Sequence, residues 1–173
     1  MPVIWFTGLP CSGKTTLSKM LEKELTAKGK EVVVLDGDEL RKTISKDLGF
    51  SEEDRKEHNR RVINLAKKLS QEGKFVIVAL VSPLRSVRQE AREQIGDGFL
   101  EVYLNCPLAE CIKRDVKGMY KKALKGEILN FTGVHQPYEE PISPDLILYT
   151  AIEDPEESLK KLLDLIKQRW EVD

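Results

Sequence analysis

The sequence predicts a single α/β domain over residues 1–173, in which a parallel sheet of about five strands carries helices on both faces. Five short apolar runs alternate with longer helical patterns, which is typical of strands that are buried on both sides. Neither a repeat nor a linker divides the chain, and 173 residues suffice for one sizeable core. The expected strands are residues 3–6, 31–36, 75–81, 99–105 and 145–150.

The helices between these strands carry recognisable start signals. One helix is expected to begin near Lys14, directly after the first strand and its glycine-rich loop. The longest helix is expected over residues 51–72, because Ser51 and Asp54 form a loose capping-box pattern. Asp154 as a cap and Pro155 in the first turn mark the start of the last helix.

The bulk composition excludes several classes of protein. A formal net charge of −1 argues against general affinity for nucleic acid, and no run of about 18 apolar residues is present to span a membrane. The chain reaches its first strand without a charged leader, so no signal peptide is expected. Cys11, Cys106 and Cys111 lack metal-ligand spacing and indicate reduced thiols in a cytoplasmic protein.

The loop GLPCSGKTT follows the first strand and fits the phosphate-binding pattern Gly-x-x-x-x-Gly-Lys-Thr. Gly8 and Gly13 allow a tight turn whose N–H groups point at one anion. Lys14 can reach the β- and γ-phosphates of a nucleotide, and Thr15 can ligate Mg²⁺. A glycine turn without a ligand is the alternative, but the strand–helix context favours nucleotide binding on a P-loop NTPase fold. The predicted ATP-binding residues of this loop are Gly8, Leu9, Pro10, Cys11, Ser12, Gly13, Lys14, Thr15 and Thr16.

Two carboxylates mark the end of the second predicted strand, in the stretch LDGDELR. Carboxylates at the carboxyl end of a parallel strand project into the crevice where substrates bind. Asp36 can orient Mg²⁺ or accept a proton from an acceptor hydroxyl, and Asp38 reaches the same region. The alternative is a plain turn, since Asp-Gly is a common turn pair.

Residues 113–133 break the alternation of strands and helices. The segment is basic, contains three glycines and lacks a clear apolar face. A solvated surface helix is the ordinary interpretation of such a charge run. In a phosphate-loop enzyme, the same composition predicts a mobile lid that brings cations to the transferring phosphate, and Arg114 is the ATP contact expected from it.

Two classes of nucleotide-binding protein compete at this point, a small-molecule kinase and a nucleotide switch. A GTPase switch needs DxxG after a strand and N/TKxD for guanine, and the sequence has neither. The kinase is favoured, and a regulatory ATP-binding module is the least favoured class. An anionic acceptor is expected because several arginines follow the predicted carboxylates. They are Arg41, Arg55, Arg60, Arg61 and Arg85.

Five stretches of the chain carry a resemblance to one family. They are GLPCSGKTT, LDGDELR, LGFSEEDRKEHNRR, VSPLR and RDVKGMYKKALKGEILNFTGVHQPYEEP. In this order and spacing they resemble adenylylsulfate kinase over nearly the whole chain. The resemblance implies Mg²⁺-dependent transfer of the γ-phosphate of ATP to the 3′-hydroxyl of adenylyl sulfate, a step of sulfate assimilation. The alternative is another small-molecule kinase with an anionic acceptor, such as a nucleotide, shikimate or gluconate.

The resemblance also implies roles for particular residues. It makes Asp36 the carboxylate between Mg²⁺ and the 3′-hydroxyl, with Asp38 in support. Ser82 matches the serine that the family names as a phosphoserine intermediate, although a backbone contact to the acceptor is the preferred interpretation. The other implied acceptor contacts are Arg41 and Arg55 on the phosphosulfate, Phe50 and Phe131 on the two faces of the adenine, and Lys117 in the lid. From the residues alone, buried packing is the favoured interpretation of Phe50.

The chain departs from the family pattern at two places in these motifs. His58 stands where the family usually has Asn after the Glu of its DRxE helix, and Asn59 follows, so either residue can contact the acceptor. A surface position is the default for His58 and His135. Cys11 replaces a more usual small residue of the loop. The resemblance further implies ATP sulfurylase and a second copy of the chain as partners to test.

Overall fold

A computed structural model describes residues 1–170 and contains the predicted five-stranded parallel sheet. The strands are β1 (Val3–Thr7), β2 (Val32–Asp36), β3 (Phe75–Ala79), β4 (Phe99–Leu104) and β5 (Leu146–Leu148), in the spatial order β2-β3-β1-β4-β5. Ala79 lies opposite both Phe6 and Asp36, and Thr7 lies opposite Tyr103. The carboxyl ends of these strands therefore meet at one edge of the sheet.

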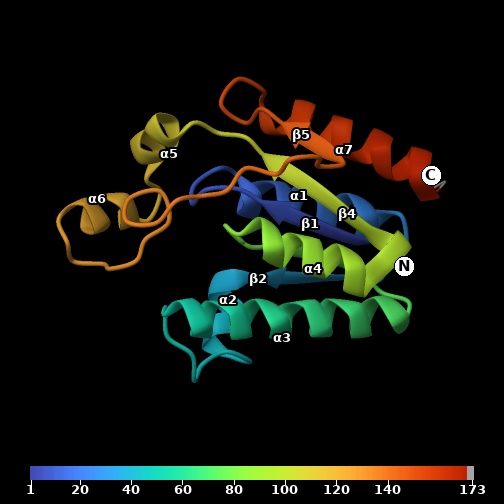
Figure 1. Ribbon diagram of the computed structural model, residues 1–173. Helices are drawn as coiled ribbons and strands as arrows, with labels where there is room; N and C mark the ends of the chain where they lie inside the picture. The colour runs from blue at the N-terminus through green and yellow to red at the C-terminus, as the bar shows by residue number, and fades with distance from the viewer. Residues whose placement is uncertain (171–173) are drawn as a thin grey trace.

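Two pairs of helices cover the sheet, one pair on each face (Figure 1). On one face, α1 (Lys14–Ala27) and α7 (Pro155–Trp170) pack against a cluster that includes Ile4 and Phe6. On the other face, α3 (Glu52–Gln71) and α4 (Arg85–Ile95) pack against a cluster that includes Val3 and Trp5. Successive residues of a strand point to opposite faces, so β1 contributes alternately to both clusters. The predicted fold class is confirmed.

The expected helix starts are also present. Ser51 caps α3, because its Oγ accepts the N–H of Asp54 at 3.1 Å. The Asp54 carboxylate bonds the N–H of Gly49 at 2.9 Å, which differs from a full capping box. At α7 the Asp154 carboxylate accepts the N–H of Glu157 at 2.8 Å.

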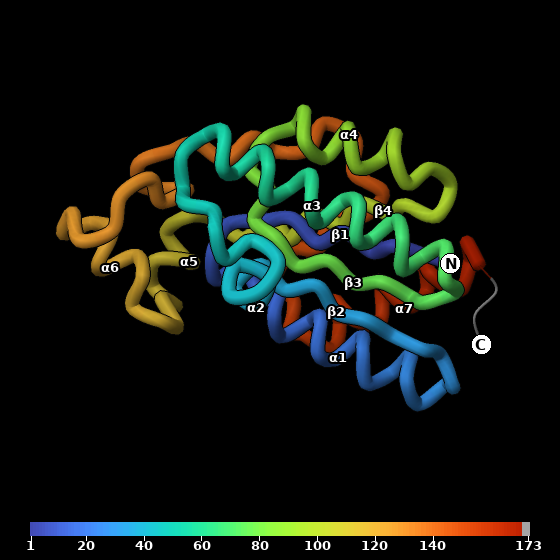
Figure 2. Tube along the Cα trace, turned by 90° about the horizontal axis from the view of Figure 1, so that it is seen from below, coloured from blue at the N-terminus to red at the C-terminus, as the bar shows by residue number. Residues whose placement is uncertain are grey.

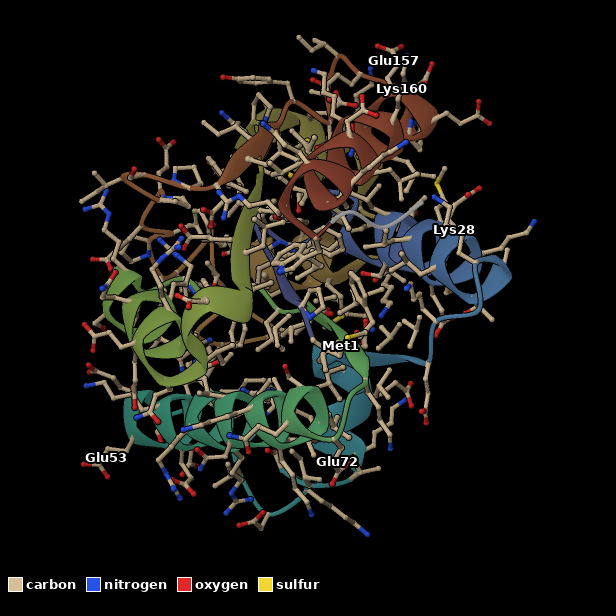
Figure 3. All side chains as sticks on the ribbon, turned by 90° about the vertical axis from the view of Figure 1, so that its right-hand side faces the viewer. Met1, Lys28, Glu53, Glu72, Glu157 and Lys160 are labelled. Atoms are coloured by element: carbon tan, nitrogen blue, oxygen red, sulfur yellow. The ribbon has the colours of Figure 1, made fainter. Side chains whose placement is uncertain are left out.

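The remaining short elements gather beyond the carboxyl edge, apart from the 3₁₀ turn Gly96–Gly98 that precedes β4. They are α2 (Gly37–Lys42), α5 (Leu108–Arg114) and α6 (Met119–Leu124). In Figures 1 and 2, α5 and α6 stand out from one end of the molecule, and the chain after α6 runs back toward β5. Figure 3 looks onto the opposite end, where Met1, Lys28 and Glu72 lie.

The segment 113–133 differs from its sequence-based description in one respect. Tyr120 and Ala123 of α6 are fully buried, and Tyr120 forms a small third cluster with Cys106 and Cys111. The segment therefore has an apolar side, which is too short to show as a periodic pattern. No helix within residues 1–170 has both the length and the apolar character that crossing a membrane requires.

Candidate active site

The loop after β1 closes around the side chain of Lys14, the first residue of α1. Its Nζ donates to the carbonyls of Gly8 and Leu9, each at 2.8 Å, and lies 3.4 Å from Ser12 Oγ. Loss of hydration lowers the pKa of Lys14 to about 8, although nearby acidic groups oppose that shift. The ammonium group is thus confined within the loop, where phosphate oxygens can replace the two carbonyls as its partners.

The backbone shape of the loop depends on its small residues. A Cβ on Gly8 would lie 2.8 Å from the carbonyl oxygen of Leu104, so no side chain fits at this crossing of loop and strand. Gly13 has a φ of +106°, in the region that favours glycine. Cys11 has a φ of +69°, which an L-residue rarely adopts. The position where this chain departs from the family pattern is therefore one that a glycine would occupy with less strain.

Side chains from distant segments support the loop from outside. Thr150 Oγ1 donates to the carbonyl of Ser12 at 2.6 Å, and Tyr120 Oη donates to the carbonyl of Pro10 at 2.7 Å. Arg114 donates from Nη1 to the carbonyl of Cys11 at 3.3 Å and from Nη2 to the carbonyl of Thr150 at 2.6 Å. Arg114 is thus beside the loop that the sequence assigns to ATP. Thr150 and Tyr120 were missed by the sequence analysis, since no local pattern distinguishes them.

Asp36 ends β2 and caps the following helix. Its Oδ1 accepts the N–H groups of Asp38 at 3.0 Å and Glu39 at 3.4 Å. The carboxylates of Asp36 and Asp38 also act to raise the pKa of Lys14, so the ends of β1 and β2 share one electrostatic site. The turn interpretation and the crevice interpretation are therefore compatible, because the same carboxylate caps α2 and faces the edge.

The residues at this edge fit Mg²⁺ bound together with a nucleotide. The Thr15 hydroxyl and the Asp36 carboxylate offer the hard oxygen ligands that this cation prefers. Within residues 1–170 no group of three or more His, Cys, Asp or Glu side chains forms a cage for a metal ion. Mg²⁺ commonly binds through one or two such protein oxygens and completes its shell with phosphate oxygens and water.

The lid segment reaches the carboxylate side of the site through one ion pair. Lys117 Nζ lies 2.6 Å from Asp38 Oδ2, and both side chains are two-thirds exposed. The attraction of Asp38 raises the pKa of Lys117. The contact therefore places the basic segment over the end of β2, although an exposed pair of this kind adds little stability.

Four of the five predicted arginines separate into two groups, and the fifth, Arg85, donates from Nε to the carbonyl of Glu140 at 2.7 Å. Arg41 donates to the carbonyl of Gly49 at 2.9 Å, and Arg55 donates to Gln136 Oε1 and to the carbonyl of Asn130. By contrast, Arg60 and Arg61 pair with carboxylates of their own surroundings. Those pairs are Arg60 with Glu57 (2.6 Å), and Arg61 with Asp47 (2.7 Å) and Glu57 (3.1 Å). Arg41 and Arg55 are therefore the better candidates for an anionic acceptor.

Two aromatic side chains lie in different environments. Phe50 is 55% exposed, and the Arg41 guanidinium lies 4.3 Å from the centre of its ring. Phe50 is therefore not a core residue, and the packing interpretation is wrong for it. Phe131 is half-buried and meets Tyr120 edge-on, with 4.9 Å between the ring centres. Its outer side is free of that contact.

His58 and Asn59 are both buried on α3, so the surface interpretation is wrong for His58. His58 Nδ1 lies 2.7 Å from the hydroxyl of Ser45, which is itself fully buried. Burial lowers the pKa of His58 to about 4, and the charges of Arg41 and Arg61 act in the same direction. The imidazole is therefore neutral at neutral pH. His135, by contrast, is exposed as expected.

Ser82 lies in the loop after β3 and is buried. Its hydroxyl accepts the Nε1–H of Trp5 at 3.0 Å and lies 3.3 Å from the carbonyl of Leu80. Its φ is +38°, in the left-handed region. The hydroxyl is thus engaged with interior groups, which does not suit a side chain that accepts a phosphoryl group.

A surface groove elsewhere does not compete with this site. It is about 310 Å³ in volume and runs between α1 and α7, with lining residues of both charges that include Lys28 and Lys160. Figure 3 looks onto the side of the molecule opposite α5 and α6 of Figure 1, and Lys28 and Lys160 are labelled there. The groove is therefore remote from the carboxyl edge.

Comparison with known proteins agrees with this geometry. The family model described as adenylylsulphate kinase matches residues 1–149. The adenylyl-sulfate kinase of Thermodesulfovibrio yellowstonii is 48% identical over 96% of this chain and 84% of its own length. A probable bifunctional SAT/APS kinase 2 of Sorangium cellulosum is also 48% identical, over 96% of this chain and 28% of the longer protein. The structure of the Mycobacterium tuberculosis APS kinase in complex with AMPPNP and APS superposes with a TM-score of 0.92, at 41% identity and over 96% and 97% of the two chains. The chain belongs to the adenylylsulfate kinase family.

Proposed function

We propose that the carboxyl edge of the sheet performs the family reaction, transfer of the γ-phosphate of ATP to the 3′-hydroxyl of adenylyl sulfate. The observation that carries this assignment is the Lys14 ammonium held by the carbonyls of Gly8 and Leu9, at the sheet edge where β2 ends in Asp36. Phosphoryl transfer needs positioning and charge stabilisation more than covalent chemistry. Both requirements are met where a confined cation faces a carboxylate.

The donor side holds ATP through the loop Gly8–Thr16 and the start of α1. The N–H groups of the loop and the positive end of the helix dipole bind the phosphates. Lys14 leaves the two loop carbonyls and pairs with the β- and γ-phosphates. Arg114 supports the loop and adds a positive charge beside it. Thr15 and Asp36 would hold Mg²⁺, which would neutralise negative charge on the phosphates.

The acceptor side binds adenylyl sulfate between α3, the loop after β3 and the lid. Asp36 accepts the proton of the 3′-hydroxyl, and Asp38 and Lys117 close the site over it. Arg41 and Arg55 bind the phosphosulfate. Phe50 and Phe131 hold the adenine, with His58 or Asn59 as a further contact. Ser82 serves through its backbone, because its hydroxyl bonds Trp5 in the interior.

The proposed setting is a reducing cytoplasm, supported by three free cysteines. An ATP sulfurylase is the proposed source of the acceptor, and the bifunctional SAT/APS kinase described above supports a link between two such activities. A homodimer is the proposed assembly. Measurement of the mass in solution checks this last point.

Competition between acceptors tests the proposed function. MgATP is offered together with adenylyl sulfate, shikimate, gluconate and AMP, and ³¹P NMR locates the new phosphate. We expect phosphate on the 3′-oxygen of adenylyl sulfate and none on the other acceptors. Transfer to another acceptor at a higher kcat/KM, or no transfer to adenylyl sulfate, would contradict the proposal.

A further inference from the structure

Arg88 on α4 is a buried arginine to which the proposed reaction assigns no role. It is 2% exposed, among the largest fully enclosed side chains of the described chain. Nη1 donates to the carbonyl of Ser82 at 2.6 Å, and Nη2 donates to the carbonyl of Glu139. Arg88 therefore ties the loop after β3 to residues 136–140, the segment between the lid and β5, which we call the strap.

The strap is also held by β1, by the same loop and by Arg85 at the start of α4, which donates from its N–H to Glu139 Oε1 and from Nε to the carbonyl of Glu140. Tyr138 Oη lies 2.7 Å from Thr7 Oγ1, which donates to the carbonyl of Val81 at 2.8 Å. The Glu139 N–H donates to the carbonyl of Pro83 at 2.9 Å. The Arg88 guanidinium also lies 5.4 Å from the centre of the Tyr138 ring. Arg88 thus stands at the centre of a closed set of contacts between strap and loop.

Both partners of Arg88 lead to the acceptor side. Ser82 has a left-handed φ of +38°, and such a backbone persists only when its surroundings hold it in place. At the other end of the strap, Gln136 accepts a hydrogen bond from Arg55. Holding loop and strap together therefore fixes the Ser82 backbone and one anchor of Arg55 at the same time.

The charge of Arg88 is balanced on the side away from the site. Its Nε lies 3.3 Å from Glu101 Oε2 on β4, and no hydrogen bond satisfies this Nε within residues 1–170. Arg92 also lies 3.9 Å from Glu101. The ion pair and the two carbonyl bonds are thus separable features of one side chain. We expect loss of the ion pair with Glu101 to lower the stability of the fold. Loss of the two carbonyl bonds should instead change the positions of the loop and the strap.

We propose that Arg88 is a positioning residue that sets the Ser82 loop and the strap, and through them Arg55, for the acceptor without touching it. The proposal rests on the proposed acceptor side. It predicts that Arg88 affects adenylyl sulfate and ATP unequally, because the phosphate loop shares none of these contacts.

Arg88→Lys tests the proposal, since lysine keeps the charge beside Glu101 but cannot bond both carbonyls with a planar fork. We expect the KM for adenylyl sulfate to rise about tenfold or more, with the KM for ATP within about twofold. Glu101→Gln is the matched control, because it removes the ion pair and leaves both carbonyl bonds. It should lower the melting temperature without changing either KM. Equal effects on the two substrates, an unchanged KM in Arg88→Lys, or a KM change in Glu101→Gln would overturn the proposal.

Hydrogen exchange of the ligand-free enzyme gives a second readout that needs no substrate. Arg88→Lys should accelerate amide exchange in residues 80–84 and 136–140, relative to wild type and to Glu101→Gln. Unchanged exchange in these two segments would overturn the positioning role. Failure of the proposed function is distinguishable, because the wild-type enzyme would then not phosphorylate adenylyl sulfate.

Discussion

The donor side and the acceptor side of the site are built in different ways. On the donor side, Lys14 bonds carbonyls that are six and five residues before it in the chain, and Tyr120, Thr150 and Arg114 support the loop from outside. On the acceptor side, the joining contacts bridge 77 to 81 residues. They are Trp5 with Ser82, Lys117 with Asp38, and Arg55 with Gln136. The ammonium of the donor side is thus held by its own loop, whereas the groups of the acceptor side are positioned by the packing of several elements.

Removal of the Lys14 ammonium should have the largest effect. We expect Lys14→Ala to lower kcat/KM by about 10³-fold, because a positioned charge on the transferring phosphate is lost. The fold should survive, since the ammonium is bound at a cost in hydration. Thermal unfolding and steady-state kinetics measure the two effects. Lys28→Ala is the control, because Lys28 lies at the far end of α1 from Lys14. Near-normal turnover in folded Lys14→Ala would contradict the donor assignment.

Asp36→Asn should have the next largest effect, a fall in kcat of about 10²-fold, as expected for loss of a positioned base. Asn caps a helix as well as Asp does, so the hydrogen bonds to Asp38 and Glu39 can persist. Equal melting temperatures for the variant and wild type would show that the charge alone has been changed. An unaltered kcat would move the catalytic role to Asp38 or to water.

Loss of either aromatic ring should act on one substrate only. Phe50→Ala and Phe131→Ala should each weaken adenylyl sulfate binding by about 1–3 kcal/mol, the usual contribution of stacking on a base. Phe50→Ala should leave the melting temperature unchanged because Phe50 is exposed, whereas Phe131→Ala should lower it slightly through the lost contact with Tyr120. Isothermal titration with each substrate makes the measurement. Early melting of Phe131→Ala with normal binding would make that residue a packing residue.

The lowered pKa of Lys14 predicts a pH dependence of ATP binding. With a pKa of about 8 in the free enzyme, Lys14 is charged below pH 8 and ready for phosphate. Above pH 8 binding must draw in a proton, so affinity should fall by up to about tenfold per pH unit. The contribution of Lys14 to folding stability changes with pH in the opposite direction. Between pH 8 and 10.5 the unfolded chain binds more protons than the folded chain, so this contribution to stability rises with pH. Calorimetry in two buffers detects the proton uptake, and its absence at pH 8.5 would contradict the shift.

Ser82→Ala should have the smallest effect on catalysis. We expect kcat to stay within about tenfold of wild type, because transfer needs no covalent intermediate. Stability should fall by about 1–3 kcal/mol, since the buried Trp5 N–H loses its acceptor. Kinetics and thermal unfolding separate the two. Isolation of a kinetically competent phosphoserine at Ser82 would overturn this expectation.

The sequence could predict the features that depend on local contacts, but not those that depend on contacts between distant segments. The strands, the helix caps and the phosphate loop depend on neighbouring residues, and the structure confirms the predicted strands and caps. The burial of His58 and Tyr120 and the support from Thr150 and Arg88 depend on contacts between distant elements. A single sequence carries no signal for such contacts, so they were found only in the folded chain. The acceptor residues came from resemblance to a family rather than from local pattern.

Measuring the binding of each substrate separately tests most directly whether the donor side and the acceptor side are built independently. A non-hydrolysable ATP analogue and adenylyl sulfate are each titrated into wild type, Lys14→Ala and the double variant Phe50→Ala/Phe131→Ala. We predict that Lys14→Ala loses affinity for the ATP analogue and keeps that for adenylyl sulfate, while the double variant does the reverse. Parallel loss of both affinities in either folded variant would contradict a site made of two separately built sides.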